Sequence, residues 1–140
     1  MTPSRSYRLL QIALAVFGVL MLLLYPLAAV WPAGWAWHAG APHRSDYFMM
    51  IVGLYVTLGL FLCNAARRPE AHLSLIWFAV CSSVVHAAIM AVQSFGSGHH
   101  LGHLIGDVPA LLLIALVLAV LVRSAGLRQT VEDVSNQVPS

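Results

Sequence analysis

Long apolar stretches alternate with short polar ones along most of the chain. Four stretches are nearly free of charge, at about residues 9–30, 47–66, 72–93 and 101–122. Each is close to the roughly 20 residues that a helix needs to cross the hydrocarbon core of a bilayer. Helices are expected because lipid cannot satisfy free backbone groups. The pattern predicts an all-α integral membrane four-helix bundle with up-down-up-down topology.

The two ends of the chain need separate interpretation. The first stretch is longer than the 7–15 apolar residues typical of a cleaved signal peptide, so we expect it to be retained as a span. Cleavage after an alanine near residues 29–36 is the alternative. Residues 124–140 are polar. We therefore expect a membrane domain over 1–123 and a polar cytoplasmic tail over 124–140.

Composition supports a membrane location. Hydrophobic residues make up 60% of the 140 residues and charged residues 9%, with a mean hydropathy of +0.84. Soluble domains usually carry about 25% charged residues, so this chain has too little charge to cover a surface in water. No basic run with interleaved aromatic residues is present, so nucleic acid is not an expected partner. The lipid bilayer is the expected partner.

The arginines predict the orientation. The chain has no lysine, and six of its seven arginines fall on one side of a four-span topology, with only Arg44 on the other. Because cytoplasmic loops carry the excess of positive charge, both termini are predicted to be cytoplasmic. Three tryptophans follow the first span, where an interfacial aromatic belt is expected. The six arginines are Arg5, Arg8, Arg67, Arg68, Arg123 and Arg128, and the tryptophans are Trp31, Trp35 and Trp37.

Two ionisable residues fall inside predicted spans. At 1.5 Å per residue, His86 lies roughly 10 Å and Asp107 roughly 9 Å from the outer end of its span. Neither is tolerated facing lipid, so we expect them to face each other or a shared cavity inside the bundle. Other polar residues follow helical spacing on the same two segments. These stripes comprise Ser82, Ser83, His86, Met90 and Gln93 on the third segment, and His100, His103 and Asp107 on the fourth.

Three hypotheses fit these stripes. His86 and Asp107 form a structural pair, or the cluster binds a transition metal, or it forms a proton relay or small-molecule pocket. Imidazole suits Zn and Cu, and a thioether suits Cu(I). The candidate metal ligands are His86, His103 and Asp107, completed by His100, His99 or Met90. Haem fits less well, because it needs two histidines at equal depth on facing helices.

Helix breakers, glycines and cysteines add local expectations. Pro26 is expected to bend the first helix, and Gly106 with Pro109 to kink or break the fourth, with Asp107 as a cap. Gly53 and Gly59 are expected to allow close helix packing. We expect Thr57 to make an interhelical hydrogen bond. Cys63 and Cys81 differ in depth, so both are expected to be free, buried thiols.

Several stretches resemble a known family. These are "YP…WP.GW.W" at 25–37, "GLYVTLGLFL" at 53–62, "VVHAAIMAVQ" at 84–93 and "HLIGDVPALLL" at 103–113. They are similar to a family of small bacterial four-span proteins that is known only as a domain of unknown function. The resemblance implies a multi-pass protein of the bacterial inner membrane and supplies no activity.

The expected function is that of a structural or accessory membrane subunit, in a homo-oligomer or a larger membrane complex. The alternatives are a metal- or haem-binding membrane protein and a small proton-coupled transporter or carrier. No nucleophile elbow, phosphate loop or HExxH motif is present, so an enzyme is not indicated.

Overall fold

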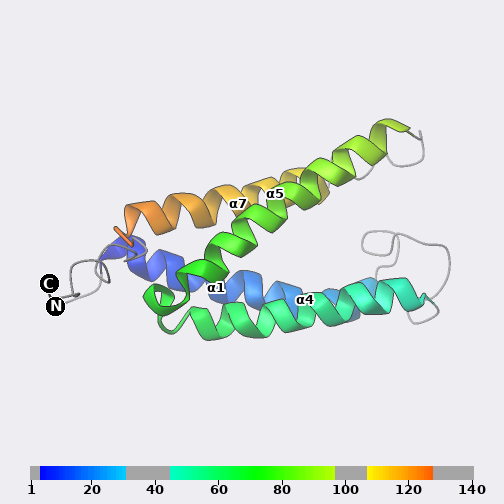
Figure 1. Ribbon diagram of the computed structural model, residues 1–140. Coiled ribbons are helices and arrows are strands. Elements are labelled where there is room, and N and C mark those ends of the chain that lie inside the picture. Colours follow the sequence, from blue (N-terminus) through cyan, green and yellow to red (C-terminus); the bar gives the residue numbers. More distant parts are fainter. Residues whose placement is uncertain (1–3, 31–44, 97–106, 128–140) are drawn as a thin grey trace, which may run out of the picture. The chain divides into compact units, whose positions relative to one another are not determined.

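The computed structural model describes residues 4–30, 45–96 and 107–127, and every regular element in this part of the chain is helical (Figure 1). Side chains of residues 93–96 and 107 lie outside the description. The prediction of an all-α chain is confirmed here. The elements are α1 (Arg5–Leu22), α2 (Leu24–Val30), α4 (Asp46–Ala65), the 3-10 helix η2 (Pro69–His72), α5 (Leu73–Gly96) and α7 (Asp107–Ser124).

Three segments are long and apolar enough to cross a membrane. They are Arg5–Leu22, Asp46–Ala65 and Pro69–Val92, with mean hydropathies of 1.4, 2.0 and 2.1. The helix Val108–Ser124 is apolar but shorter, and residues 101–106, expected to complete the fourth span, lie outside the described residues. Only 17%, 28% and 22% of the three long segments is buried by the chain itself. Many of their large apolar side chains are exposed, among them Ile12, Leu54 and Phe78.

The first predicted span is divided into two helices. Helix α1 ends at Leu22, and α2 begins at Leu24. The backbone amides of Leu23 and Leu27 keep their bonds to the residues four positions earlier, at 3.0 and 2.9 Å. Pro26 has no N–H to donate to the carbonyl of Leu22, and its ring crowds that carbonyl. The expected bend at Pro26 is confirmed, as a break one turn before the proline.

The chain forms two compact units. The first unit comprises Gln11–Arg68, and the second comprises Met1–Leu10 together with Pro69–Ser140. Helix α1 contributes its first turns to the second unit and its remainder to the first.

In the first unit, α1 and α4 pack antiparallel through two glycines. A Cβ on Gly59 would stand 2.7 Å from the carbonyl oxygen of Gly18, and one on Gly18 would stand 2.9 Å from the carbonyl oxygen of Gly59. Near the start of α1, the Gln11 side-chain amide donates to the carbonyl of Arg67 at 3.3 Å. Small residues let the backbones of two apolar helices approach each other closely. The expectation that Gly59 serves close packing is confirmed.

The other end of this pair is closed by α2. Leu24 and Ala28 of α2 form a buried cluster with Phe48 and Val52 of α4. Helix α4 begins there because the Ser45 side chain caps it, accepting a hydrogen bond from the amide of Phe48 at 3.2 Å. The break before α2 thus leaves an apolar turn packed against the start of α4.

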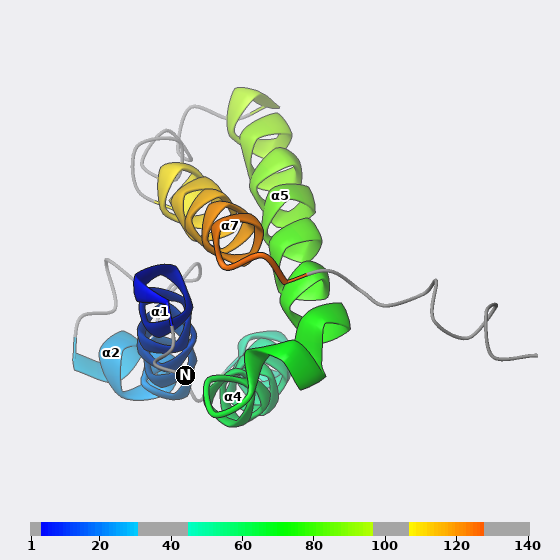
Figure 2. The same cartoon turned by 90° about the vertical axis from the view of Figure 1, so that its left-hand side faces the viewer.

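The second unit contains an antiparallel pair of helices, α5 and α7 (Figures 1 and 2). The buried residues of α5 recur at alternating steps of three and four, which is the spacing of a continuous helix–helix seam. Three small residues four positions apart lie on this face, namely Ala79, Ser83 and Ala87. The buried residues are Leu73, Ile76, Ala79, Val80, Ser83 and Ala87 of α5, and Val108, Ala115, Leu118 and Val122 of α7.

The end of α7 is set by Gly126. This glycine has a φ of 71°, in the left-handed region that favours glycine. The amide of Leu127 donates to the carbonyl of Val122 at 3.3 Å, and the amide of Gly126 donates to the carbonyl of Arg123 at 3.1 Å. Together these bonds form a Schellman C-cap. The helix therefore stops close to residue 124, where the polar tail was expected to begin.

Candidate functional site

The predicted polar stripe of α5 lies on and beside its seam with α7. Ser83 is buried, and His86 and Met90, one and two turns further along, are half-buried. Ala87, next to His86, is buried as well. The structure therefore brings Ser83, His86 and Met90 to one side of α5, as their spacing predicts.

Ser83 is the one buried polar side chain in the described part of the chain, at 9% exposure. A helical serine often bonds to the carbonyl four residues earlier, and buried hydroxyls usually have a partner. Because Ser83 is buried, its hydroxyl is expected to find its partner within the protein.

Ser82 does not share this environment. Its Oγ donates to the carbonyl of Ala79 within the same helix, at 3.2 Å, and the side chain is half-buried. Its hydrogen-bonding capacity is met locally, so it has no need of an interhelical partner. Of the two adjacent serines, Ser83 is the one positioned to take part in a site between α5 and α7.

The other half of the predicted pair is only partly described. Asp107 is the first residue of α7, and Pro109 stands in the first turn, where its missing N–H is no loss because these amides have no acceptor within the helix. The side chains of Asp107 and Gln93 lie outside the described residues. The contact between His86 and Asp107 thus stays a prediction, although their helices do pack together.

The predicted metal site stays a prediction as well. His99, His100 and His103 lie outside the described residues, as do Trp31, Trp35 and Trp37. Within the described part of the chain, no three His, Cys, Asp or Glu side chains are grouped closely enough to hold a metal ion. His86 and Met90 are therefore the only predicted ligands whose side chains are described.

Polar contacts near the arginine-bearing helix ends were missed by sequence reasoning. The Tyr7 hydroxyl donates to the Glu70 carboxylate at 2.7 Å. The Arg123 guanidinium carbon lies 5.9 Å from the centre of the Trp77 ring, within range of a cation–π interaction. The sequence did contain a signal for the second contact. Arg123 stands near the end of one apolar helix, and Trp77 stands near the start of the preceding one. The arginines were used only to predict orientation.

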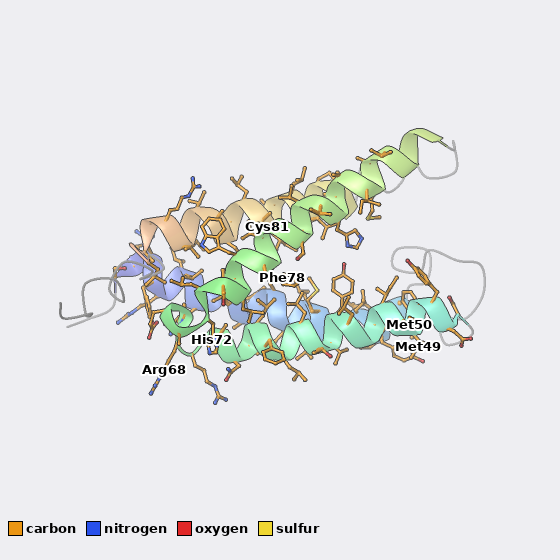
Figure 3. The ribbon with its side chains drawn as sticks, viewed as in Figure 1. Met49, Met50, Arg68, His72, Phe78 and Cys81 are labelled. Atoms are coloured by element: carbon orange, nitrogen blue, oxygen red, sulfur yellow. The ribbon has the colours of Figure 1, made fainter. Side chains whose placement is uncertain are left out.

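Three expectations about single residues are wrong. Gly53 has no atom within 4 Å of an added Cβ, so it does not serve packing as Gly59 does. Thr57 donates to the carbonyl of Gly53 in its own helix, at 2.9 Å, rather than between helices. Cys63 and Cys81 are both free, as expected, but neither is fully buried. Cys81 is exposed on α5, like its neighbour Phe78 (Figure 3).

These features define a class of small all-α proteins with apolar helices of membrane-spanning length. The chain belongs to a family of unknown function, DUF6632, whose model matches residues 4–138. The resemblance to an uncharacterised family is thereby confirmed over nearly the whole chain. No curated protein and no solved structure matches the chain.

Proposed function

We propose that the chain is an integral membrane protein that serves as a structural or accessory subunit. The observation that carries this proposal is the exposure of apolar side chains along the long helices, where at most 28% of a span is buried by the chain itself. Soluble monomers rarely expose apolar patches beyond a few hundred Å². Lipid and partner helices would cover this surface in a membrane.

The arginine-bearing ends support a cytoplasmic location for both termini. In the first unit, Gln11 near the start of α1 bonds to Arg67 at the end of α4. In the second unit, Tyr7 bonds to Glu70 at the start of η2, and Arg123 near the end of α7 lies over Trp77. Each unit therefore gathers its arginine-bearing ends on one side. The positive-inside rule then points that side to the cytoplasm, in the bacterial inner membrane.

The seam between α5 and α7 favours a structural role over transport. Ile76, Leu118 and Val122 are almost completely buried, so this part of the seam is closed by apolar packing. Ser83 and His86 lie further along α5, towards the end that we place in the outer half of the membrane. We propose that His86 pairs with Asp107 there and fixes the register of the two helices, with Ser83 beside them.

A double-mutant cycle tests the proposed pair. His86→Ala and Asp107→Ala should each lower thermal stability in detergent. Removing one member of a buried pair leaves the other buried without its partner, which costs roughly 3–5 kcal/mol of stability. The double variant should be less damaging than the sum of the two single changes. Ser82→Ala is a matched control, since its hydroxyl is satisfied within its own helix, and it should change stability little.

Two results would contradict this role. Simple additivity of the His86 and Asp107 effects would show that the pair does not exist. Metal content and an absorption spectrum should be measured on the same detergent-purified protein. A stoichiometric metal that is lost on replacing His100 and His103 would replace the structural role with metal binding, the first alternative above.

A further inference from the structure

The five arginines in the described part of the chain are all exposed. An exposed cation near apolar surface is free to bind an anion supplied from outside the chain. These residues are Arg5, Arg8, Arg67, Arg68 and Arg123.

Three of these arginines belong to the second unit. Arg5 and Arg8 are three residues apart in the first turns of α1, and Arg123 is near the end of α7. Figures 1 and 2 draw the start of α1 and the end of α7 at the same end of this unit. The positive pole of the α1 dipole adds to the charge of Arg5 and Arg8.

The same unit holds a contact between the start of α1 and η2. Glu70 accepts a hydrogen bond from the Tyr7 hydroxyl at 2.7 Å. The Tyr7–Glu70 bond ties the start of α1, which carries Arg5 and Arg8, to η2.

Trp77 gives Arg123 a defined position. The guanidinium lies over the indole ring, 5.9 Å from its centre. Stacking uses the face of the guanidinium and leaves its N–H groups, which lie in its plane, open to an acceptor. An arginine fork matches a phosphate through two parallel hydrogen bonds. Tryptophan itself favours the headgroup level of a bilayer.

We propose that Arg123, oriented by Trp77, binds the phosphate of an anionic phospholipid headgroup, with Arg5 and Arg8 contributing charge. This inference rests on the membrane insertion proposed above. The same chemistry would accept inorganic phosphate. Lipid is the source favoured here because Trp77 lies on an apolar helix of spanning length, next to the arginine that makes the contact.

Fluorescence quenching by brominated lipids tests the site. Replacing Trp31, Trp35 and Trp37 by Phe in the full chain leaves Trp77 as its single tryptophan. The protein is reconstituted in vesicles of phosphatidylcholine containing brominated phosphatidylcholine or brominated phosphatidylglycerol. The measured quantity is the ratio of quenching by the anionic lipid to quenching by the zwitterionic lipid.

We expect a ratio well above one that falls as salt is raised, because charge screening weakens an exposed contact. Arg123→Gln should lower the lipid preference about fivefold, the size expected for one cation at a membrane surface. Arg68→Gln is the matched control, since it removes the same charge from an exposed arginine of the first unit, and it should change the ratio much less.

The outcomes separate the two proposals. Absence of quenching by either brominated lipid would contradict membrane insertion itself. Quenching by both lipids with a ratio of one, or an equal loss for Arg68→Gln, would overturn the lipid site alone. Displacement of phosphatidylglycerol by millimolar inorganic phosphate would show that the site takes free phosphate instead. If the tryptophan variant does not fold, thermal stabilisation of the natural chain by the anionic lipid over the zwitterionic one gives the same comparison.

Discussion

Gly18 and Gly59 show how single residues hold the first unit together. Each lies where the other's carbonyl oxygen occupies the space that a side chain would need, at 2.9 and 2.7 Å from an added Cβ. The Cys63 thiol is also close, with its sulfur 4.0 Å from the carbonyl oxygen of Ala15. Gly59 was expected from sequence to serve packing, whereas the partner role of Gly18 needed the register of α1 against α4.

Gly59→Ala should destabilise the first unit. The new Cβ would meet the Gly18 carbonyl and the Met21 Cβ, at 2.7 and 3.0 Å, and neither is the far end of a flexible side chain. Overpacking of this kind costs roughly 1–3 kcal/mol. Thermal unfolding in detergent micelles is the measurement.

Gly53→Ala on the same helix is the control for that experiment. Nothing lies within 4 Å of its added Cβ, and alanine is favoured over glycine in a helix by about 1 kcal/mol. It should therefore leave stability unchanged or raise it slightly. Equal effects at the two glycines would contradict the packing inferred for α1 and α4.

At the residue scale, spacing alone predicts which side chains share one face of a helix. The stripe of Ser83, His86 and Met90 follows from helical periodicity. Predictions failed where the neighbouring helix decided. Gly53 and Gly59 are alike in sequence, but only Gly59 meets α1. Thr57 lies on an exposed face of α4 and satisfies its hydroxyl within the helix, so it needs no partner across an interface.

At the scale of elements, prolines act according to their position in a helix. Pro26 follows a long helical run and removes one hydrogen bond, which separates α1 from α2. Pro109 stands in the first turn of α7, where the amide would be unpaired in any case. The sequence indicates the positions of both prolines. It does not indicate the residues at which α1 ends and α7 begins.

Pro26→Ala should join α1 and α2 into one helix. The new amide can donate to the carbonyl of Leu22, and a hydrogen bond of this kind contributes about 0.5–1.5 kcal/mol. Hydrogen exchange monitored by NMR in micelles should show a protected amide at residue 26 and slower exchange around Leu23. Pro109→Ala is the control and should leave α7 largely unchanged. A break that persists after Pro26→Ala would assign it to packing rather than to the proline.

The α5–α7 pair shows how much of a helix–helix interface can be predicted from sequence. The predicted up-down-up-down topology makes successive spans antiparallel, and the structure shows α5 and α7 packed together. The seam itself, with small residues at Ala79, Ser83 and Ala87, was not predicted, because apolar residues surround both helices. A helix that is apolar on every side does not reveal which face meets a neighbour.

At the scale of the whole molecule, composition and segment length were enough to predict an all-α chain with apolar helices. These properties depend on solvent and backbone hydrogen bonding, which act on every residue alike. The candidate site depends instead on a few side chains from separate segments. For His86 and Asp107, spacing predicts the depth of each residue in the membrane and the side of the helix on which it lies. The distance between the two residues depends on how α5 and α7 cross, which spacing does not determine.

The orientation that we propose for the whole chain rests on its arginines. The Gln11–Arg67 contact lies beside arginines in the first unit, and the Tyr7–Glu70 contact does so in the second. Placing the arginine-bearing helix ends in the cytoplasm also puts His86 in the outer half of the membrane and Arg123 at the inner surface. Both the polar pair and the lipid site therefore depend on the same orientation.

Reporter fusions measure that orientation most directly. One enzyme active only in the cytoplasm and one active only in the periplasm are fused in turn after residue 127, beyond the C-cap at Gly126. The same pair is fused within the polar stretch around Arg44, between the first and second spans. The cytoplasmic reporter should be active at the C-terminus and the periplasmic reporter near Arg44. The reverse pattern, or the same active reporter at both positions, would contradict the membrane topology on which the proposed function rests.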